Sequence, residues 1–410
     1  MKKLFALLLS LAMVLALVAC GQKDPTPDTP DTPDDPQTKV EYKVAMITDY
    51  GDITDQSFNQ TTYEACKAFA EDNSIEFSYF KPAGDNTADR VAMIEKAVND
   101  GFNVIVMPGY AFGGAIVEAA PEFPDVKFIA LDVAAGDLLE TAVAKAGEAY
   151  DYTPENWDLN KYVDMSNVYC AVYQEELCGY MAGYAAVKLG YKNLGFLGGM
   201  AVPAVVRYGY GFVQGVDAAA ADLGLTDVTV NYVYGGQFFG DADITAVMDT
   251  WYQGGTEVVF ACGGGIYTSA VDAAKKVGAK VIGVDVDQAG VIAKYAGVDG
   301  MTVTSAMKGL YPATYDTLTD VIVNGNWDKY VGKIATLGLV SGTDPEANYV
   351  QIPMGDGTQW SDSFTQDDYK AMVKDMFDGK ITVSNNTSSD VSAADFATVI
   401  TVDDQGSIKG

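Results

Sequence analysis

Short apolar runs alternate with longer amphipathic segments from about residue 40 onward. In the first half of the chain they predict strands at 44–47, 75–80, 104–107 and 126–131, and helices at 56–72, 87–100 and 113–123. The strand segments are apolar at consecutive positions, which is typical of strands covered on both faces. With helices between them, we expect a parallel, doubly wound α/β sheet.

The same alternation starts again in the second half. It predicts helices at 175–189, 204–223, 244–253 and 269–277, and strands at 193–197, 228–233, 258–261 and 281–284. We therefore predict two α/β lobes, each a doubly wound parallel sheet. We expect strand 302–306 and helix 311–323 to return to the first lobe, and the tail with its helix 366–377 to return to the second. The expected boundaries are 41–165 with 289–325 for lobe 1, and 166–288 with 326–410 for lobe 2, joined by a hinge of several crossings.

Two local features add detail. The segment 136–166 carries Tyr150, Tyr152, Trp157 and Tyr162 among polar residues. It is long for a connection, and we expect a rim loop or lid. Gly179 and Gly183 lie four residues apart on a predicted helix, which indicates close helix packing.

The first twenty residues have the order of a secretory leader. Lys2 and Lys3 precede an apolar run from Leu4 to Ala19, and Cys20 follows. Its small-residue ending resembles a bacterial lipobox, which predicts a signal peptide over 1–19 and a lipid on Cys20. An uncleaved anchor or a chance cysteine is the alternative. Residues 20–40, rich in Pro, Asp and Thr, predict a linker, so we expect a body lipid-anchored to the outer face of the cell membrane.

Charge and residue usage narrow the classes of function. The net charge is −30 and the chain has no histidine. The charge argues against nucleic-acid binding. The missing histidine excludes Ser-His-Asp and Cys-His catalysis and histidine metal sites. The cysteines lack CxxC spacing, so we expect no metal, no cofactor, and cysteines that serve as small buried side chains.

Three aspartates lie at the ends of predicted strands: Asp49, Asp132 and Asp285. Ligands of such sheets bind at the carboxyl ends of strands and between domains. Three carboxylates at one cleft are suited to accept hydrogen bonds from a ligand rich in N–H and O–H groups.

Other residues near the strand ends have more than one interpretation. Asp55 or Ser57 is placed to cap the helix that follows. Spacing alone puts Phe58 in the core, and Lys308 on the solvated surface. Gly263-Gly264-Gly265 lacks a phosphate-loop pattern, but lets a ligand approach backbone N–H groups.

At these residues the chain resembles the basic membrane protein family of lipoproteins. These are substrate-binding proteins of ABC transporters and include purine nucleoside receptors. The similarity runs from Val44 to about Leu310, and its motifs are Asp49 with 55–60 (DQSFNQ), 173–177 (YQEEL) with 182–186 (AGYAA), and 198–200 (GGM) with 203–216. The resemblance implies a periplasmic-binding-protein type I-like fold.

The resemblance also implies a set of ligand-binding residues. The family holds a nucleobase between two aromatic rings, and Phe58 and Tyr208 match those positions, Tyr208 standing where phenylalanine is common. The base-edge positions match Asp49, Asn59 and Asp132, and the ribose positions match Gly263 or Gly264, Asp285 and Lys308. For Phe58 and Lys308 this reverses the expectation from spacing.

The expected protein is a monomeric trap that closes two lobes on a nucleoside and delivers it to an ABC permease. Closure then needs no covalent chemistry, so we expect no enzyme and no catalytic residue. Three alternatives stay open: a monosaccharide receptor, a ligand sensor of the same fold, and an exported nucleoside hydrolase.

Overall fold

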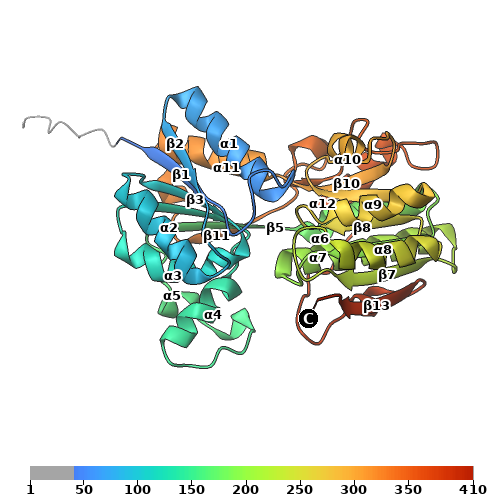
Figure 1. Ribbon diagram of the computed structural model, residues 1–410, viewed down its shortest axis with the longest axis horizontal. Coiled ribbons are helices and arrows are strands. Elements are labelled where there is room, and N and C mark those ends of the chain that lie inside the picture. The colour runs from blue at the N-terminus through green and yellow to red at the C-terminus, as the bar shows by residue number, and fades with distance from the viewer. Residues whose placement is uncertain (1–40, 410) are drawn as a thin grey trace, which may run out of the picture. The chain divides into compact units, whose positions relative to one another are not determined.

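The computed structural model describes residues 41–409, so the predicted leader, Cys20 and the whole predicted linker lie outside the described residues. The described chain forms two separate sheets, each flanked by helices (Figure 1). This confirms the predicted α/β class with two doubly wound sheets.

The first sheet has the strand order β11-β5-β4-β3-β1-β2, and all its pairs are parallel. Its strands are β1 (Lys43–Ile47), β2 (Glu76–Phe80), β3 (Val104–Pro108), β4 (Lys127–Leu131), β5 (Val168–Tyr173) and β11 (Lys333–Leu337). Its helices are α1 (Phe58–Asn73), α2 (Thr87–Asn99), α3 (Gly113–Ala119), α4 (Ala135–Lys145), α5 (Leu159–Tyr162) and α11 (Leu310–Leu318). Every residue of β3 is buried, as its continuous apolar pattern predicts.

The second sheet has the order β12-β10-β9-β8-β6-β7-β13, parallel except for the β10–β12 pair. Its strands are β6 (Asn193–Gly198), β7 (Thr229–Tyr234), β8 (Val258–Cys262), β9 (Lys280–Asp285), β10 (Thr302–Lys308), β12 (Val350–Gln351) and β13 (Thr401–Ser407). Its helices are α6 (Glu175–Lys188), α7 (Pro203–Leu223), α8 (Ala242–Gln253), α9 (Tyr267–Val277), α10 (Ala289–Ala296) and α12 (Gln366–Phe377). Strand β13 forms the edge beside β7 (Figure 1), and most of its residues are exposed.

Strand membership corrects three of the expected lobe assignments. Strand β5 belongs to the first sheet, although the expected boundary put residues after 165 in lobe 2. Strand β10 pairs with β9 in the second sheet rather than returning to the first. Strand β11 pairs with β5, so part of the tail returns to the first sheet. Two helices go where we expected. Helix α11, which follows β10, packs beside α1 (Figure 1), and the tail helix α12 lies in the second lobe, where its Tyr369 hydroxyl donates to Met181 Sδ of α6.

The segment 136–166 is also more regular than a rim loop. Helix α4 occupies its first part and the short α5 lies near its end. Asp137 caps α4, because its carboxylate accepts a hydrogen bond from the Ala134 N–H. The aromatic side chains of Tyr150 and Trp157 pack against each other at 5.7 Å between ring centroids.

Within residues 41–409 the chain passes between the two sheets three times, after β5, β10 and β11. The crossing segments are hydrogen-bonded to one another. The Gln174 N–H donates to Leu337 O, the Tyr349 N–H to Gly338 O, and the Gly309 N–H to Tyr349 O. These hydrogen bonds join the three crossing segments to one another and so form the hinge between the two sheets.

Packing between α6 and α7 confirms the expected close approach of two helices. A Cβ atom at Gly179 would lie 2.3 Å from the Tyr208 carbonyl oxygen, and one at Gly183 would lie 2.3 Å from that of Phe212. Gly211 and Gly215 meet the α6 backbone in the same way from the other side. The four glycines therefore set the distance between these helices.

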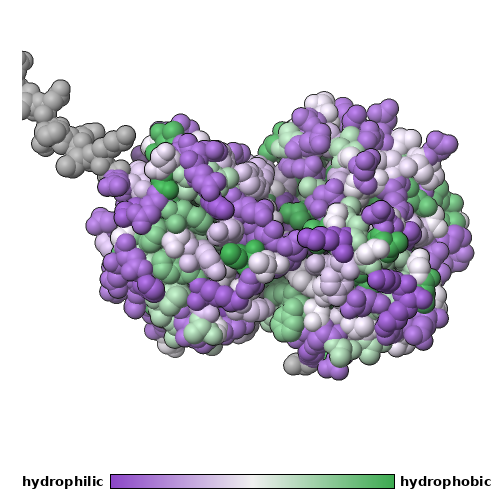
Figure 2. Space-filling model, turned by 45° about the horizontal axis from the view of Figure 1, so that its top comes forward, coloured by the Kyte–Doolittle hydropathy of each residue, from purple (hydrophilic) through white to green (hydrophobic). Residues whose placement is uncertain are grey.

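Cys66, Cys170, Cys178 and Cys262 are buried, as expected, and no disulfide joins any two of them. None of the helices in the described range has the length and apolarity needed to cross a membrane. Hydrophilic side chains cover most of the face seen in Figure 2, in keeping with the strongly acidic composition.

Candidate functional site

A cavity of about 370 Å³ lies where the strand ends of the two sheets meet. Its volume falls in the range of small-molecule sites. The structure brings together all nine residues singled out from the sequence, since each lines this cavity: Asp49, Phe58, Asn59, Asp132, Tyr208, Gly263, Gly264, Asp285 and Lys308. Strand-end reasoning thus located the cavity, while the role of each residue stays a prediction.

One wall comes from the end of β1 and the start of α1. Asp49 Oδ1 accepts hydrogen bonds from the backbone N–H groups of Tyr50 and Gly51, at 2.7 and 2.8 Å. Burial nevertheless raises the pKa of Asp49. Asn59 donates its amide to Asp55 Oδ2 at 3.1 Å, while its own Oδ1 is buried and has no partner among the described residues.

The start of α1 is capped by Asp55. Its carboxylate accepts from the backbone N–H groups of Ser57, Asn59 and Gln60. Ser57 precedes the helix but makes no capping bond. Of the two candidates, Asp55 therefore acts as the cap and leaves the Ser57 hydroxyl available for other contacts.

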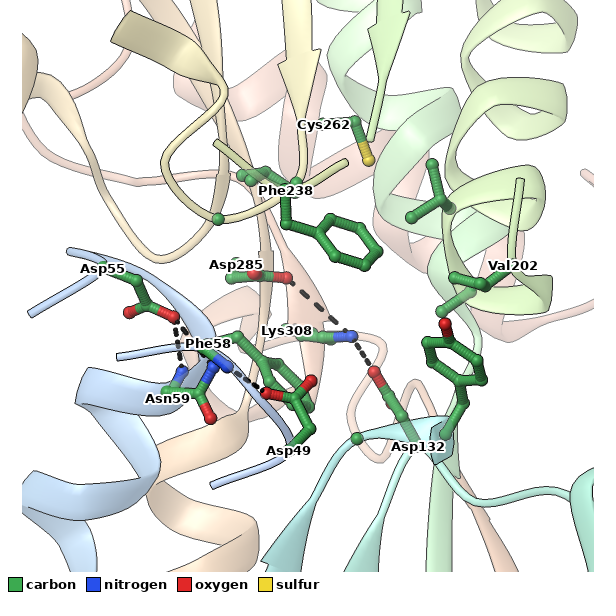
Figure 3. Close-up of a pocket in the computed structure, with 18 of the residues that line it drawn as sticks. Asp49, Asp55, Phe58, Asn59, Asp132, Val202, Phe238, Cys262, Asp285 and Lys308 are labelled. Atoms are coloured by element: carbon green, nitrogen blue, oxygen red, sulfur yellow. Dashed lines mark hydrogen bonds and ion pairs between the residues drawn. The ribbon is translucent and has the colours of Figure 1, made fainter. Parts of the chain in front are cut away.

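Lys308 is the centre of charge in the cavity wall. Its Nζ lies 2.5 Å from Asp132 Oδ2 and 3.8 Å from Asp285 Oδ1 (Figure 3). It also lies 3.5 Å from Glu175 Oε1. Burial alone lowers the pKa of Lys308, but the three carboxylates together raise it above its usual range. The side chain is 3% exposed, so the expectation from spacing of a solvated lysine is wrong.

Asp132 and Asp285 share an unusual backbone conformation. Their φ angles are +59° and +66°, in the left-handed region that costs non-glycine residues energy. Burial raises the pKa of Asp132 to about 6, against the effect of Lys308. Asp132 Oδ1 is buried and has no partner among the described residues. This oxygen and Asn59 Oδ1 are acceptors that need a donor.

Phe58 lies at the cavity, against the core position that spacing alone favours. It is partly exposed, and Lys308 Nζ lies 4.7 Å from its ring centroid. Tyr208 is 2% exposed, packs edge-on against Phe260, and donates its hydroxyl to Asp285 Oδ1 at 3.2 Å. Its ring therefore belongs as much to the core as to the cavity wall.

Sequence reasoning missed Phe238, on the loop between β7 and α8. Figure 3 shows its ring directed into the cavity from the side opposite Phe58. The ring packs against Gly199 and Gly263. A Cβ atom would lie 2.3 Å from the ring at Gly199 and 2.8 Å from it at Gly263, so the ring needs glycine at both positions. The signal in the sequence was weak, because Phe238 lies four residues after the end of β7, whereas each of the three aspartates lies within two residues of the end of its strand.

A second group of charged residues in the wall was also missed. Arg207 Nε donates to Glu175 Oε2 at 2.7 Å, which links Arg207 to Lys308 through one carboxylate. Asp137 lines the cavity too, and burial raises its pKa to about 7. None of these residues directly follows a predicted strand, so the strand-end rule passed over them.

Comparisons with known proteins agree with this architecture. The model of a family described as PnrA-like ABC transporter substrate-binding proteins matches residues 42–345. BmpA of Lactococcus lactis, named an ABC transporter nucleoside-binding protein, is 25% identical over 389 residues, covering 92% of this chain and 96% of BmpA. A CD4+ T-cell-stimulating antigen of Listeria monocytogenes is 28% identical over 78% of this chain and 84% of its own length.

A crystal structure of an ABC transporter solute-binding protein from Aeropyrum pernix K1 has the same fold. Its TM-score is 0.63 at 19% identity, over 85% of this chain and 95% of the other. The fold is thus that of the type I-like periplasmic binding proteins. Because the family model covers most of the chain, this protein belongs to the PnrA-like family of ABC transporter substrate-binding proteins.

Proposed function

We propose that this protein captures a nucleoside, with a purine base preferred, and presents it to an ABC permease. The observation that carries the proposal is the pair of aromatic rings, Phe58 and Phe238, on opposite sides of one cavity. A flat heterocycle between them stacks on both rings, and base–aromatic stacking contributes about 1–3 kcal/mol per base in nucleic-acid complexes.

The polar groups suit the edge of a base. Asn59 Oδ1 and Asp132 Oδ1 are acceptors that lack a donor among the described residues. The ring N–H and amino groups of a purine supply such donors, and bonds to a carboxylate are the stronger kind. Asp49 lines the same wall and adds a third acceptor group.

The remaining residues suit a sugar without phosphate. Asp285 is able to accept from the vicinal hydroxyls of ribose, and Lys308 to donate to a sugar oxygen. Gly263 and Gly264 permit close approach of the ligand to the backbone. Asp132, Asp285 and Glu175 lie beside Lys308, so a nucleotide's phosphate next to this lysine would meet repulsion.

The name of the Lactococcus lactis relative, a nucleoside-binding protein, supports the same ligand class. We further propose that Tyr208 braces Asp285 rather than stacking on the base, since its ring is buried and its hydroxyl bonds to that carboxylate. The lipid anchor at Cys20, the outer membrane face and the monomeric state are part of this proposal and rest on the sequence.

The test is to identify the ligand directly. Mass spectrometry of small molecules released on denaturing the purified protein should find a nucleoside. Calorimetric titration with inosine, guanosine, adenosine, ribose and glucose should give binding for the nucleosides only. Binding of ribose or glucose without any nucleoside would make the protein a monosaccharide receptor. Release of hypoxanthine from inosine would indicate a hydrolase.

A further inference from the structure

The last described residues of the chain lie against the loop that carries Phe238. Strand β13 pairs in parallel with β7, so both strands end at the same side of the sheet. After β13 the chain continues alongside the β7–α8 loop, residues 235–241, and the Ile408 N–H donates to Tyr234 O at 2.8 Å. The family model ends at residue 345, so this segment is an addition to the matched region.

Lys409 holds the loop from its outer side. Its Nζ donates to Gln237 Oε1 at 2.9 Å and forms an ion pair with Asp241. Gln237 in turn donates to Phe239 O and to Asp241 Oδ2, each at 2.9 Å. The two partners of Lys409 therefore lie on either side of Phe238 in the sequence: Gln237 directly precedes it and Asp241 follows three residues later.

The backbone fits closely at the same place. Gly236 has φ of +79°, and a Cβ there would lie 2.8 Å from both Cβ and O of Lys409. On its inner side the loop is held by the Gly265 N–H, which donates to Phe238 O at 2.9 Å, and by the glycines beneath the ring. Phe238 is therefore held from the cavity side and, through its neighbours, by Lys409.

We propose that Lys409 is a positioning residue for the cavity, and that the segment 401–409 acts as a strap that fixes the Phe238 loop and so slows ligand release. The ligand-binding part of this inference rests on the proposed function. The loop-fixing part does not, because it concerns only contacts within the protein.

Segment 401–409 could serve only to cover strand β7, and a substitution at Lys409 distinguishes this role from that of a strap. Lys409→Met removes the donor to Gln237 and Asp241 but leaves β13 and its pairing in place. We expect about fivefold faster hydrogen exchange, confined to amides 235–241, which corresponds to the net contribution of about one ordinary hydrogen bond. Inosine should bind about three- to tenfold more weakly, through faster dissociation.

Two further variants serve as controls. Lys409→Arg keeps the charge and should restore most of the wild-type behaviour. Lys380→Met removes a surface lysine that pairs with Asp375 in the same tail, and should change neither exchange at 235–241 nor inosine dissociation. In the double variant Lys409→Met with Gln237→Met, the combined effect should be smaller than the sum of the two single effects, because both changes remove the bond between Lys409 and Gln237.

The outcomes separate the two proposals. Unchanged exchange at 235–241 in Lys409→Met would overturn the strap, whatever happens to affinity, and so would faster exchange with unchanged inosine dissociation. If the wild-type protein binds no nucleoside, the proposed function fails. The exchange measurement, made without ligand, then decides the loop-fixing part alone.

Discussion

The Ser57 hydroxyl donates a 2.6 Å hydrogen bond to Asp285 Oδ2, across 228 positions of sequence and between the two sheets. The other oxygen of Asp285 accepts from Tyr208 and lies 3.8 Å from Lys308 Nζ. One carboxylate therefore gathers groups from both sides of the cavity. A second bond, from Gln288 Nε2 to Gln56 O at 3.2 Å, joins the same two sides.

Removing either facing ring should weaken nucleoside binding. Phe58→Ala and Phe238→Ala should each raise the dissociation constant about 5- to 150-fold, the equivalent of about 1–3 kcal/mol of lost stacking. Phe377→Ala, at a half-exposed position on α12, should bind as the wild type does. Calorimetry with inosine measures all three. Normal binding by both cavity variants would show that the base lies elsewhere. Tyr208→Ala is less informative, because it removes a buried ring from the core.

Lys308 should be needed for folding as well as for binding. Lys308→Met leaves the carboxylates of Asp132, Asp285 and Glu175 buried without their cation, and should lower the free energy of unfolding by about 3–5 kcal/mol. Lys276→Met, which breaks an exposed pair with Asp249, should cost less than about 1 kcal/mol. Urea denaturation compares the two, and equal losses would contradict the central role of Lys308.

Asp137 should make stability depend on pH. Burial raises the pKa of this carboxyl from 3.8 to about 7, so between these pH values the folded protein holds a proton that the unfolded chain has released. Stability from this group is therefore lost as pH rises through the window, by at most about 1.4 kcal/mol per pH unit. Asp137→Asn keeps an oxygen to accept the Ala134 N–H and removes the titration.

The Asn variant should thus gain stability relative to wild type as pH rises from 5 to 8. Urea denaturation at each pH unit measures the difference, and Asp299→Asn at an exposed position serves as the control. A difference that stays constant with pH would show that Asp137 does not titrate in this range.

Helix packing gives a test of stability far from the ligand. A Cβ at Gly215 would lie 2.1 Å from the Tyr180 carbonyl oxygen, so Gly215→Ala must push α6 and α7 apart and should cost about 1–3 kcal/mol. Gly290→Ala, on α10 with open space around the new Cβ, should instead stabilise by about 0.5–1 kcal/mol. Opposite shifts in thermal unfolding are expected, and a stable Gly215→Ala variant would contradict the close contact.

The sequence predicted the periodic parts of the fold and the place of the cavity. Buried strands of parallel sheets are continuous apolar runs, so their ends can be located from the sequence without knowing which strands pair. Ligands bind at the carboxyl ends of such strands, and for this reason Asp49, Asp132 and Asp285 were found. Which sheet a strand joins depends on contacts distant in sequence. For this reason β10 and β11 were assigned to the wrong lobes.

Side-chain environment was harder to predict than position. Lysine is usually exposed, and only the meeting of carboxylates from three other elements makes burial of Lys308 favourable. Phe238 was missed because its role depends on facing Phe58 across the cavity, and the two lie 180 positions apart in the chain. Strand β5 was not predicted, because it directly follows the polar segment 136–166. Its apolar run is nevertheless typical of a buried strand.

Strand β13 leaves one line of backbone N–H and C=O groups open at the edge of the second sheet, where a strand from another molecule could join it. Asp403 and Asp404 stand in the middle of this strand, and both are exposed. A second copy aligned on the same edge would bring like charges together. These two carboxylates therefore disfavour the growth of a continuous intermolecular sheet along this edge.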